Sequence, residues 1–200
     1  MGVLTDFFVA SEDELKSAFR GWAKPLPLLD DFIVKQGLNP FTGKMFVFRT
    51  RIPHGSLEAS PDAIAHAKFH HLPWIDQKGL SSMDVVLLTE VVMDWDHDNA
   101  KSEIHGRIYA GPEGTEQLLF ELPPPFVARL AATTAESYAT LTSRWASKIR
   151  ADAATIPNPR RKEMELGRPD SEWVTRLSEI ARLAKVATES HRAMFMWICP

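Results

Sequence analysis

The sequence predicts an α+β protein in which a mixed or antiparallel sheet carries helices on one face, with two long helices in the C-terminal half. Three observations support this class. Strand-like segments are interspersed with helical ones, two of them form a hairpin pattern, and the two longest helical patterns fall after residue 122. A length of 200 residues suits one hydrophobic core, so residues 1–200 are expected to form a single α+β domain.

The N-terminal part alternates predicted strands and helices. Residues 3–10, "VLTDFFVA", are β-branched and aromatic enough for a strand. Ser11 and Glu14 follow with the spacing of a capping box, which indicates that a short helix begins there. A Pro/Gly turn signal precedes a second predicted strand at 45–52, and the segment at 60–72 opens with a serine cap and a proline, as helices commonly do.

The middle of the chain predicts a helix, a hairpin and a long helix. Residues 81–95 have the length of a helix, although their valine-rich centre leaves a strand as the alternative. Residues 102–110 and 116–122 are joined across "GPEG" and predict a β-hairpin. Residues 123–153 begin with three prolines, which suits the start of the longest predicted helix.

The C-terminal part predicts a loop, a helix and an apolar end. Residues 156–170 are charged and interrupted by prolines, which favours an exposed connection. Asp170 is the predicted cap of a second long helix that extends to about residue 191. The last apolar segment, 194–199, is a short strand or a buried tail, and it is a candidate to pair with the strand at 3–10.

Bulk properties disfavour several classes of function. The chain has 23 basic and 26 acidic residues and a formal charge of −3, so it has no basic surplus for a nucleic-acid backbone. Its single cysteine, Cys199, excludes an intrachain disulfide and a multi-cysteine zinc site and fits a reducing cytoplasm. The sequence has no basic leader and no long uninterrupted apolar run, so export and membrane spanning are not expected.

Short motifs along the chain resemble one protein family. They are the opening "MGVLTDFF", the "KGL" that leads into the predicted helix at 81–95, the "LPPPFVARLA" and "SRWA" segments, and an aromatic-x-Trp ending, here "FMW". Together they resemble a family of small bacterial proteins that has no established activity. The resemblance implies an α+β cytoplasmic protein and carries no site residues over to this chain.

The segment "DWDHDNA", residues 94–100, suggests a metal site because its aspartates recur at alternate positions. Asp94, Asp96 and Asp98 match the first ligand positions of an EF-hand calcium loop. The rest of that loop does not match, since Asn99 replaces the glycine of the sharp turn and His105 stands where a bidentate glutamate is needed. A solvated turn stabilised by side-chain contacts with the backbone is therefore the preferred interpretation.

Histidines give a second candidate metal site. His66 and His70 are four residues apart and would share one face of a helix, the spacing with which paired histidines bind zinc. Ala67 stands where a zinc protease has its glutamate base, so that chemistry is not supported. A divalent metal site, with zinc as the first candidate, would need further ligands such as His97 or Asp96. Polar surface histidines are the alternative interpretation.

Six tryptophans are many for this length, and tryptophan often anchors protein interfaces. Four of them fall in apolar patterns typical of a core: Trp22, Trp145, Trp173 and Trp197. Trp74 and Trp95 instead have polar, turn-like neighbours and are the interface candidates, with burial in the core as the alternative.

Two functional hypotheses follow. The first is a non-enzymatic bacterial protein-binding protein without a cofactor, most concretely an immunity protein that covers the active site of a toxin. Its partner-binding residues would be Trp74, Asp94, Trp95, Asp96 and Asp98. The alternative is a metal-dependent hydrolase or metal-binding regulator that uses His66, His70 and His97. No G-x-S-x-G elbow and no phosphate-binding glycine loop occurs in the sequence, which disfavours serine-based and nucleotide-driven chemistry.

Overall fold

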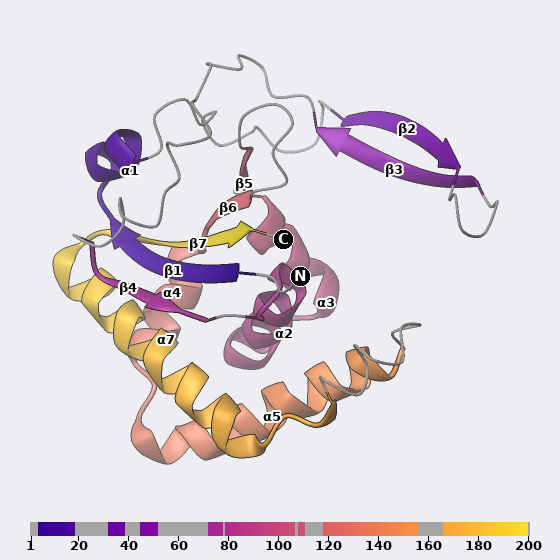
Figure 1. Ribbon diagram of the computed structural model, residues 1–200. Helices are drawn as coiled ribbons and strands as arrows, with labels where there is room; N and C mark the ends of the chain where they lie inside the picture. Colours follow the sequence, from indigo (N-terminus) through magenta and orange to yellow (C-terminus); the bar gives the residue numbers. More distant parts are fainter. Residues whose placement is uncertain are drawn as a thin grey trace.

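The computed structural model describes residues 4–18, 32–38, 45–51, 72–77, 79–106, 108–110, 118–155 and 166–199. Within these ranges the main element is a five-stranded sheet in the order β4-β1-β7-β6-β5, and every neighbouring pair is antiparallel (Figure 1). Its strands are β1 Leu4–Ala10, β4 Trp74–Asp76, β5 Ile108–Ala110, β6 Leu118–Glu121 and β7 Ala193–Cys199. The α+β class is confirmed, with the sheet in its antiparallel form.

The first and last strands of this sheet lie side by side, as the sequence led us to expect. β1 pairs with β7 over seven residues, from Leu4 opposite Cys199 to Ala10 opposite Ala193. β4 borders β1 on the other side, and β6 borders β7. The apolar end of the chain is therefore held by backbone hydrogen bonds in the interior of the sheet.

The described part of the chain contains six helices, and in that part no helix is both long and apolar enough to cross a membrane. They are α1 Glu12–Ala18, α2 Ser82–Met93, α3 His97–His105, α4 Pro124–Ala131, α5 Ala135–Ala154 and α7 Asp170–Ser190. α1 begins at the predicted capping box, where the amide of Ser11 donates to Oε2 of Glu14 at 2.7 Å. The predicted helices at 81–95 and 170–191 are confirmed as α2 and α7, with Pro169 rather than Asp170 at the cap position of α7.

Two cores form because neighbouring side chains of a strand point to opposite faces. Phe7 and Val9 of β1 belong to the larger core, to which α2, α4, α5 and α7 also contribute. Phe8 and Ala10 belong to the smaller core on the other face, together with Leu15 of α1. The longer helices thus cover one face of the sheet, as predicted, and α1 packs against the opposite face (Figure 1).

The structure corrects the predicted hairpin at 102–110 and 116–122. Its pairing strands are only β5 and β6, because residues 97–105 form α3. Asp96 caps that helix by accepting a hydrogen bond from the amide of Asn99, and this capping outweighs the strand-like composition that follows it.

The structure also corrects the single long helix at 123–153, which is divided into α4 and α5 around residues 132–134. At this break the amide of Thr134 donates to Oγ of Ser137, so a new helix begins without a proline or glycine.

A separate two-stranded sheet pairs β2 Phe32–Leu38 with β3 Met45–Arg51, and β3 confirms the strand predicted at 45–52. The predicted helix at 60–72 and the predicted loop at 156–170 fall mainly outside the described residues.

Two tryptophans join the long helices on the covered face. Trp145 and Trp173 are buried and meet edge to face, with ring centroids 5.1 Å apart. Nε1 of Trp145 donates to the carbonyl oxygen of Asp84 at 2.8 Å, which links α5 to the start of α2. Trp197 is buried on the other face, so three of the four predicted core tryptophans are confirmed, and Trp22 lies outside the described residues.

A charged network surrounds the Trp173 ring. The guanidinium carbons of Arg168 and Arg176 lie 5.5 and 5.9 Å from the ring centroid. Both side chains also donate to Oε1 of Glu172, at 2.9 Å from Arg168 and 2.7 Å from Arg176. Burial alone would raise the pKa of Glu172, but the hydrogen bonds and charges of the two arginines outweigh it and hold this pKa below its usual value.

Candidate functional site: an acidic turn between two helices

The acidic turn, residues 94–98, lies where α2 ends and α3 begins. Asp94 follows the last residue of α2 in the left-handed conformation, with φ 56° and ψ 38°, which aspartate adopts more readily than most other residues. Asp96 is the cap of α3, and its Oδ1 accepts from the amide of Asn99 at 2.9 Å. The predicted turn is confirmed at residues 94–96, whereas residues 97–99 lie in the first turn of α3.

Three carboxylates of the acidic turn are exposed, and a tryptophan lies among them. Asp94, Asp96 and Asp98 are exposed, whereas Trp95 is half-buried and packs against the larger core. Asp98 makes no hydrogen bond or ion pair within the described part of the chain. The turn therefore presents negative charge around an indole ring that is anchored in the core.

A buried carboxylate holds the acidic turn in place. The side chain of Glu90, on α2, is only 5% exposed. Its Oε1 accepts from Nδ1 of His97 and its Oε2 accepts from Nζ of Lys148, both at 2.6 Å. His97 begins α3 and Lys148 lies on α5, so these charge-assisted hydrogen bonds join the helices on both sides of the turn to a third helix.

A further ion pair at the turn is weak by comparison. Nη2 of Arg144 lies 3.2 Å from Oδ1 of Asp94, and these side chains are 49% and 88% exposed. Exposed pairs of this kind contribute about 0–1 kcal/mol, because water screens the charges. Arg144 can therefore exchange Asp94 for another anion at little cost.

The structure places the predicted partner-binding residues in two regions. Asp94, Trp95, Asp96 and Asp98 form the acidic turn. Trp74 instead lies on β4, half-buried against the smaller core on the opposite face of the sheet. The acidic turn is thus a site without Trp74.

The predicted metal ligands are not brought together in the described residues. His66 and His70 lie outside those residues, and Nδ1 of His97 is hydrogen-bonded to Glu90. Across the described ranges, no group of three or more His, Cys, Asp or Glu side chains is arranged to hold a metal ion. The metal site stays a prediction.

Two residues of the site were missed in the sequence. Glu90 stands alone in the apolar run "VVLLTEVVM", and a charged residue in a buried helix requires a partner, so this position carried a usable signal. Its partner Lys148 is 58 residues away on another helix, and no local pattern in the sequence identifies that pairing.

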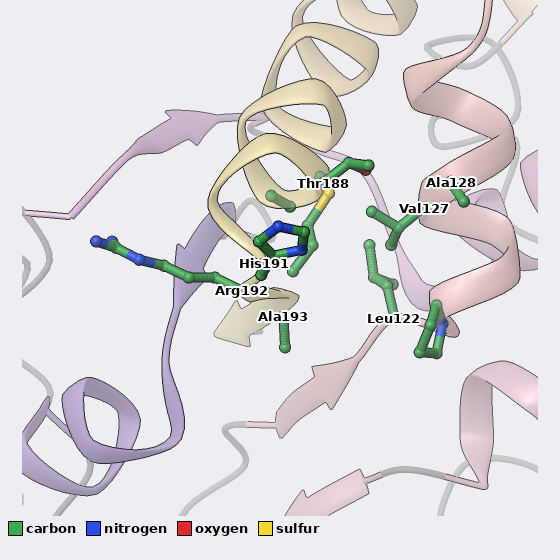
Figure 2. A pocket seen from close by; sticks show the side chains of 10 residues that line it. Leu122, Val127, Ala128, Thr188, His191, Arg192 and Ala193 are labelled. Carbon is green, nitrogen blue, oxygen red and sulfur yellow. The ribbon is translucent and has the colours of Figure 1, made fainter.

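A hollow of about 360 Å³ lies between α4 and the end of α7, away from the acidic turn. Figure 2 shows Leu122 and Val127 on one side of it and Thr188 and His191 on the other, with Arg192 pointing away. Arg192 instead lies 3.4 Å from Glu14, on α1. Most of the walls are apolar, and the hollow offers a single imidazole as its reactive group among the described residues that line it.

Comparisons with protein-family models, with curated proteins and with solved structures found no match.

Proposed function

We propose that this protein binds another protein through the acidic turn and has no catalytic role of its own. Its most concrete form is an immunity protein that neutralises a bacterial toxin by covering the toxin's active site, in the reducing cytoplasm to which a single cysteine is suited. The observation that carries the proposal is the set of exposed carboxylates on a turn that Glu90, His97 and Lys148 hold in place.

The rigidity of the acidic turn supports this proposal. Binding immobilises loops and side chains, which costs about 0.5–1.5 kcal/mol for each flexible side chain at an interface. The turn is already fixed by the cap at Asp96 and by the hydrogen bonds of Glu90. Much of this ordering cost is therefore met during folding rather than during association.

The charge and chemistry of the turn indicate the kind of partner. Three exposed carboxylates complement a surface rich in lysine and arginine, and such complementarity raises the association rate and selects the partner. The half-buried Trp95 adds an aromatic side chain among the charged residues, and tryptophan is enriched among residues that dominate binding energy. A basic active-site cleft is the partner surface that this arrangement fits.

The test uses substitutions that keep the turn but remove its charge. Asparagine caps helices as well as aspartate does and also tolerates the left-handed conformation, so Asp94→Asn, Asp96→Asn and Asp98→Asn together should fold normally. The matched control removes three exposed carboxylates elsewhere: Glu12→Gln, Asp13→Asn and Glu189→Gln. Both variants change the net charge by the same amount.

Tagged wild-type protein and the two variants are used to capture partners from a lysate of the source bacterium. The proposal predicts a stoichiometric partner that binds the wild type and the control but not the turn variant, and whose own activity is blocked by the wild type. Failure to capture a partner, or equal capture by all three proteins, would contradict it.

A further inference from the structure

A groove of about 720 Å³ lies beside the acidic turn, between the ends of α2 and α4 and the first half of α5. Val91 and Val92 of α2 and Leu141 of α5 provide its apolar surface. Its volume falls within the range of about 300–1,000 Å³ that is common for sites of small ligands. The groove is thus large enough for a small molecule with an apolar body.

Two arginines from different helices line this groove. The guanidinium of Arg129, in the last turn of α4, is exposed and makes no hydrogen bond or ion pair within the described ranges. Arg144, on α5, has only its weak pair with Asp94. Two like charges on one groove repel each other, and an anion bound between them would be attracted to both and would offset this repulsion.

Further donors for an anion lie at the same groove. Thr140 lines it and has no hydrogen-bond partner in the described part of the chain, so its hydroxyl is available to donate. Thr133 and Ser137 also line it, but their hydroxyls already donate to the carbonyl oxygens of Arg129 and Thr134. They lie at the start of α5, a helix of 20 residues. The amide of Ser137 already donates to the carbonyl oxygen of Thr134, so the start of α5 adds only the general preference of a helix N-terminus for negative charge.

We propose that this groove is a binding site for a small amphipathic anion. The carboxylate or phosphate group of the ligand lies between Arg129 and Arg144, because guanidinium groups bind such oxyanions through paired hydrogen bonds. The apolar body of the ligand lies over Val91, Val92 and Leu141. This site shares Asp94 with the proposed partner surface, but neither proposal depends on the other.

Asp94 belongs to both the groove and the acidic turn, so one substitution should change anion binding and partner binding in opposite directions. Its carboxylate forms an ion pair with Arg144, so it competes with the anionic group of a ligand for that guanidinium. Asp94→Asn removes this competition and should tighten anion binding about threefold, since an exposed pair is worth less than about 1 kcal/mol. The same substitution should weaken binding of the protein partner.

The experiment is isothermal titration calorimetry in a phosphate-free buffer. The ligands are phenyl phosphate and benzoate, each of which joins an oxyanion to an apolar ring, with inorganic phosphate and phenol as controls for the two halves. We expect saturable binding of phenyl phosphate or benzoate with a Kd on the order of 1 mM or below, and weaker binding of both controls. If phenyl phosphate binds more tightly than benzoate, the natural ligand is a phosphate; if benzoate binds more tightly, it is a carboxylate.

Variants of the groove decide whether the arginines are responsible. Arg129→Gln and Arg144→Gln should each weaken binding about tenfold, because each removes a charge-assisted hydrogen-bonding group. Arg182→Gln is the matched control, since Arg182 is exposed on α7, does not line the groove and has no ion pair among the described residues. Circular dichroism verifies that each variant is folded.

Two results would overturn the proposal. One is the absence of saturable binding for both phenyl phosphate and benzoate. The other is binding that survives unchanged in both Arg129→Gln and Arg144→Gln, because the anion would then lie elsewhere.

Discussion

Replacing Glu90 with glutamine tests the element that holds the acidic turn in place. The substitution keeps the size of the side chain but removes the negative charge that His97 and Lys148 share. Breaking a fully buried ion pair costs about 3–5 kcal/mol, because an unpaired charge is left without water. Here the side chains of His97 and Lys148 are 46% and 43% exposed, so both regain water when Glu90 is lost. We therefore expect a loss of about 1–2 kcal/mol in the free energy of unfolding, near the value of one hydrogen bond to a charged group.

Urea unfolding followed by far-UV circular dichroism measures this loss, and a double-mutant cycle assigns it to the pair. Glu90→Gln, Lys148→Met and the double variant should give a coupling energy of about 1 kcal/mol. Lys185→Met is the matched control, because Lys185 lies 3.9 Å from Glu189 in an exposed pair and should show little effect. The reasoning is refuted if Lys148→Met costs the same free energy with and without Glu90.

Three further predictions concern the charged network, the tryptophan pair and metal. Trp145→Phe should lower the free energy of unfolding by about 1–3 kcal/mol in urea titrations, because it removes the hydrogen bond to Asp84 and reduces the contact with Trp173; an unchanged value would refute this. Glu172 has a lowered pKa, so its ion pairs stabilise the fold above its usual value of 4.5, and this contribution is lost as the pH falls through the lowered pKa. In acid titrations followed by circular dichroism, the Glu172→Gln variant should therefore lose less stability than the wild type as the pH falls. The difference should be no more than about 1 kcal/mol, because the side chain of Glu172 is partly exposed. A steeper loss of stability in acid for the variant would contradict this assignment. The protein-binding account predicts that a chelator leaves the melting temperature unchanged, whereas stoichiometric metal in the purified protein would favour the predicted histidine site.

Local signals in the sequence were enough to locate most of the elements. Ser11 and Glu14 marked the start of α1 because both halves of a capping box lie within four residues. The apolar segment at 194–199 was a candidate to pair with the first strand, because sheet pairing would satisfy the backbone groups of an apolar terminus, and its pairing with β1 is confirmed. Signals of this kind depend on neighbouring residues, so they can be read without the fold.

Features that depend on distant or competing contacts were missed. Residues 102–105, the second half of α3, were predicted as part of a strand because their composition resembles one, and the helix that Asp96 caps extends through them instead. The division between α4 and α5 has neither proline nor glycine, so only the side-chain contact between Thr134 and Ser137 marks it. The three-residue strand β4 is too short to show a period in the sequence.

The residues of the candidate site also fall into two groups, those that are close together in the sequence and those that only the fold brings together. Asp94, Trp95, Asp96 and Asp98 could be recognised as one site because they are consecutive or nearly so in the chain. The hydrogen bond from Lys148 to Glu90 and the arginines of the groove could not, because they come from helices that only the tertiary structure brings together.

The affinity of the captured partner is the measurement that decides whether the acidic turn is a binding site. Isothermal titration calorimetry would compare the wild type, the variant with Asp94→Asn, Asp96→Asn and Asp98→Asn, and the matched control, each at low and high salt. The account predicts that the turn variant binds about tenfold to a hundredfold more weakly and responds less to salt, because three charge contacts are lost. Equal affinity and equal salt dependence for the turn variant and the wild type would contradict the account.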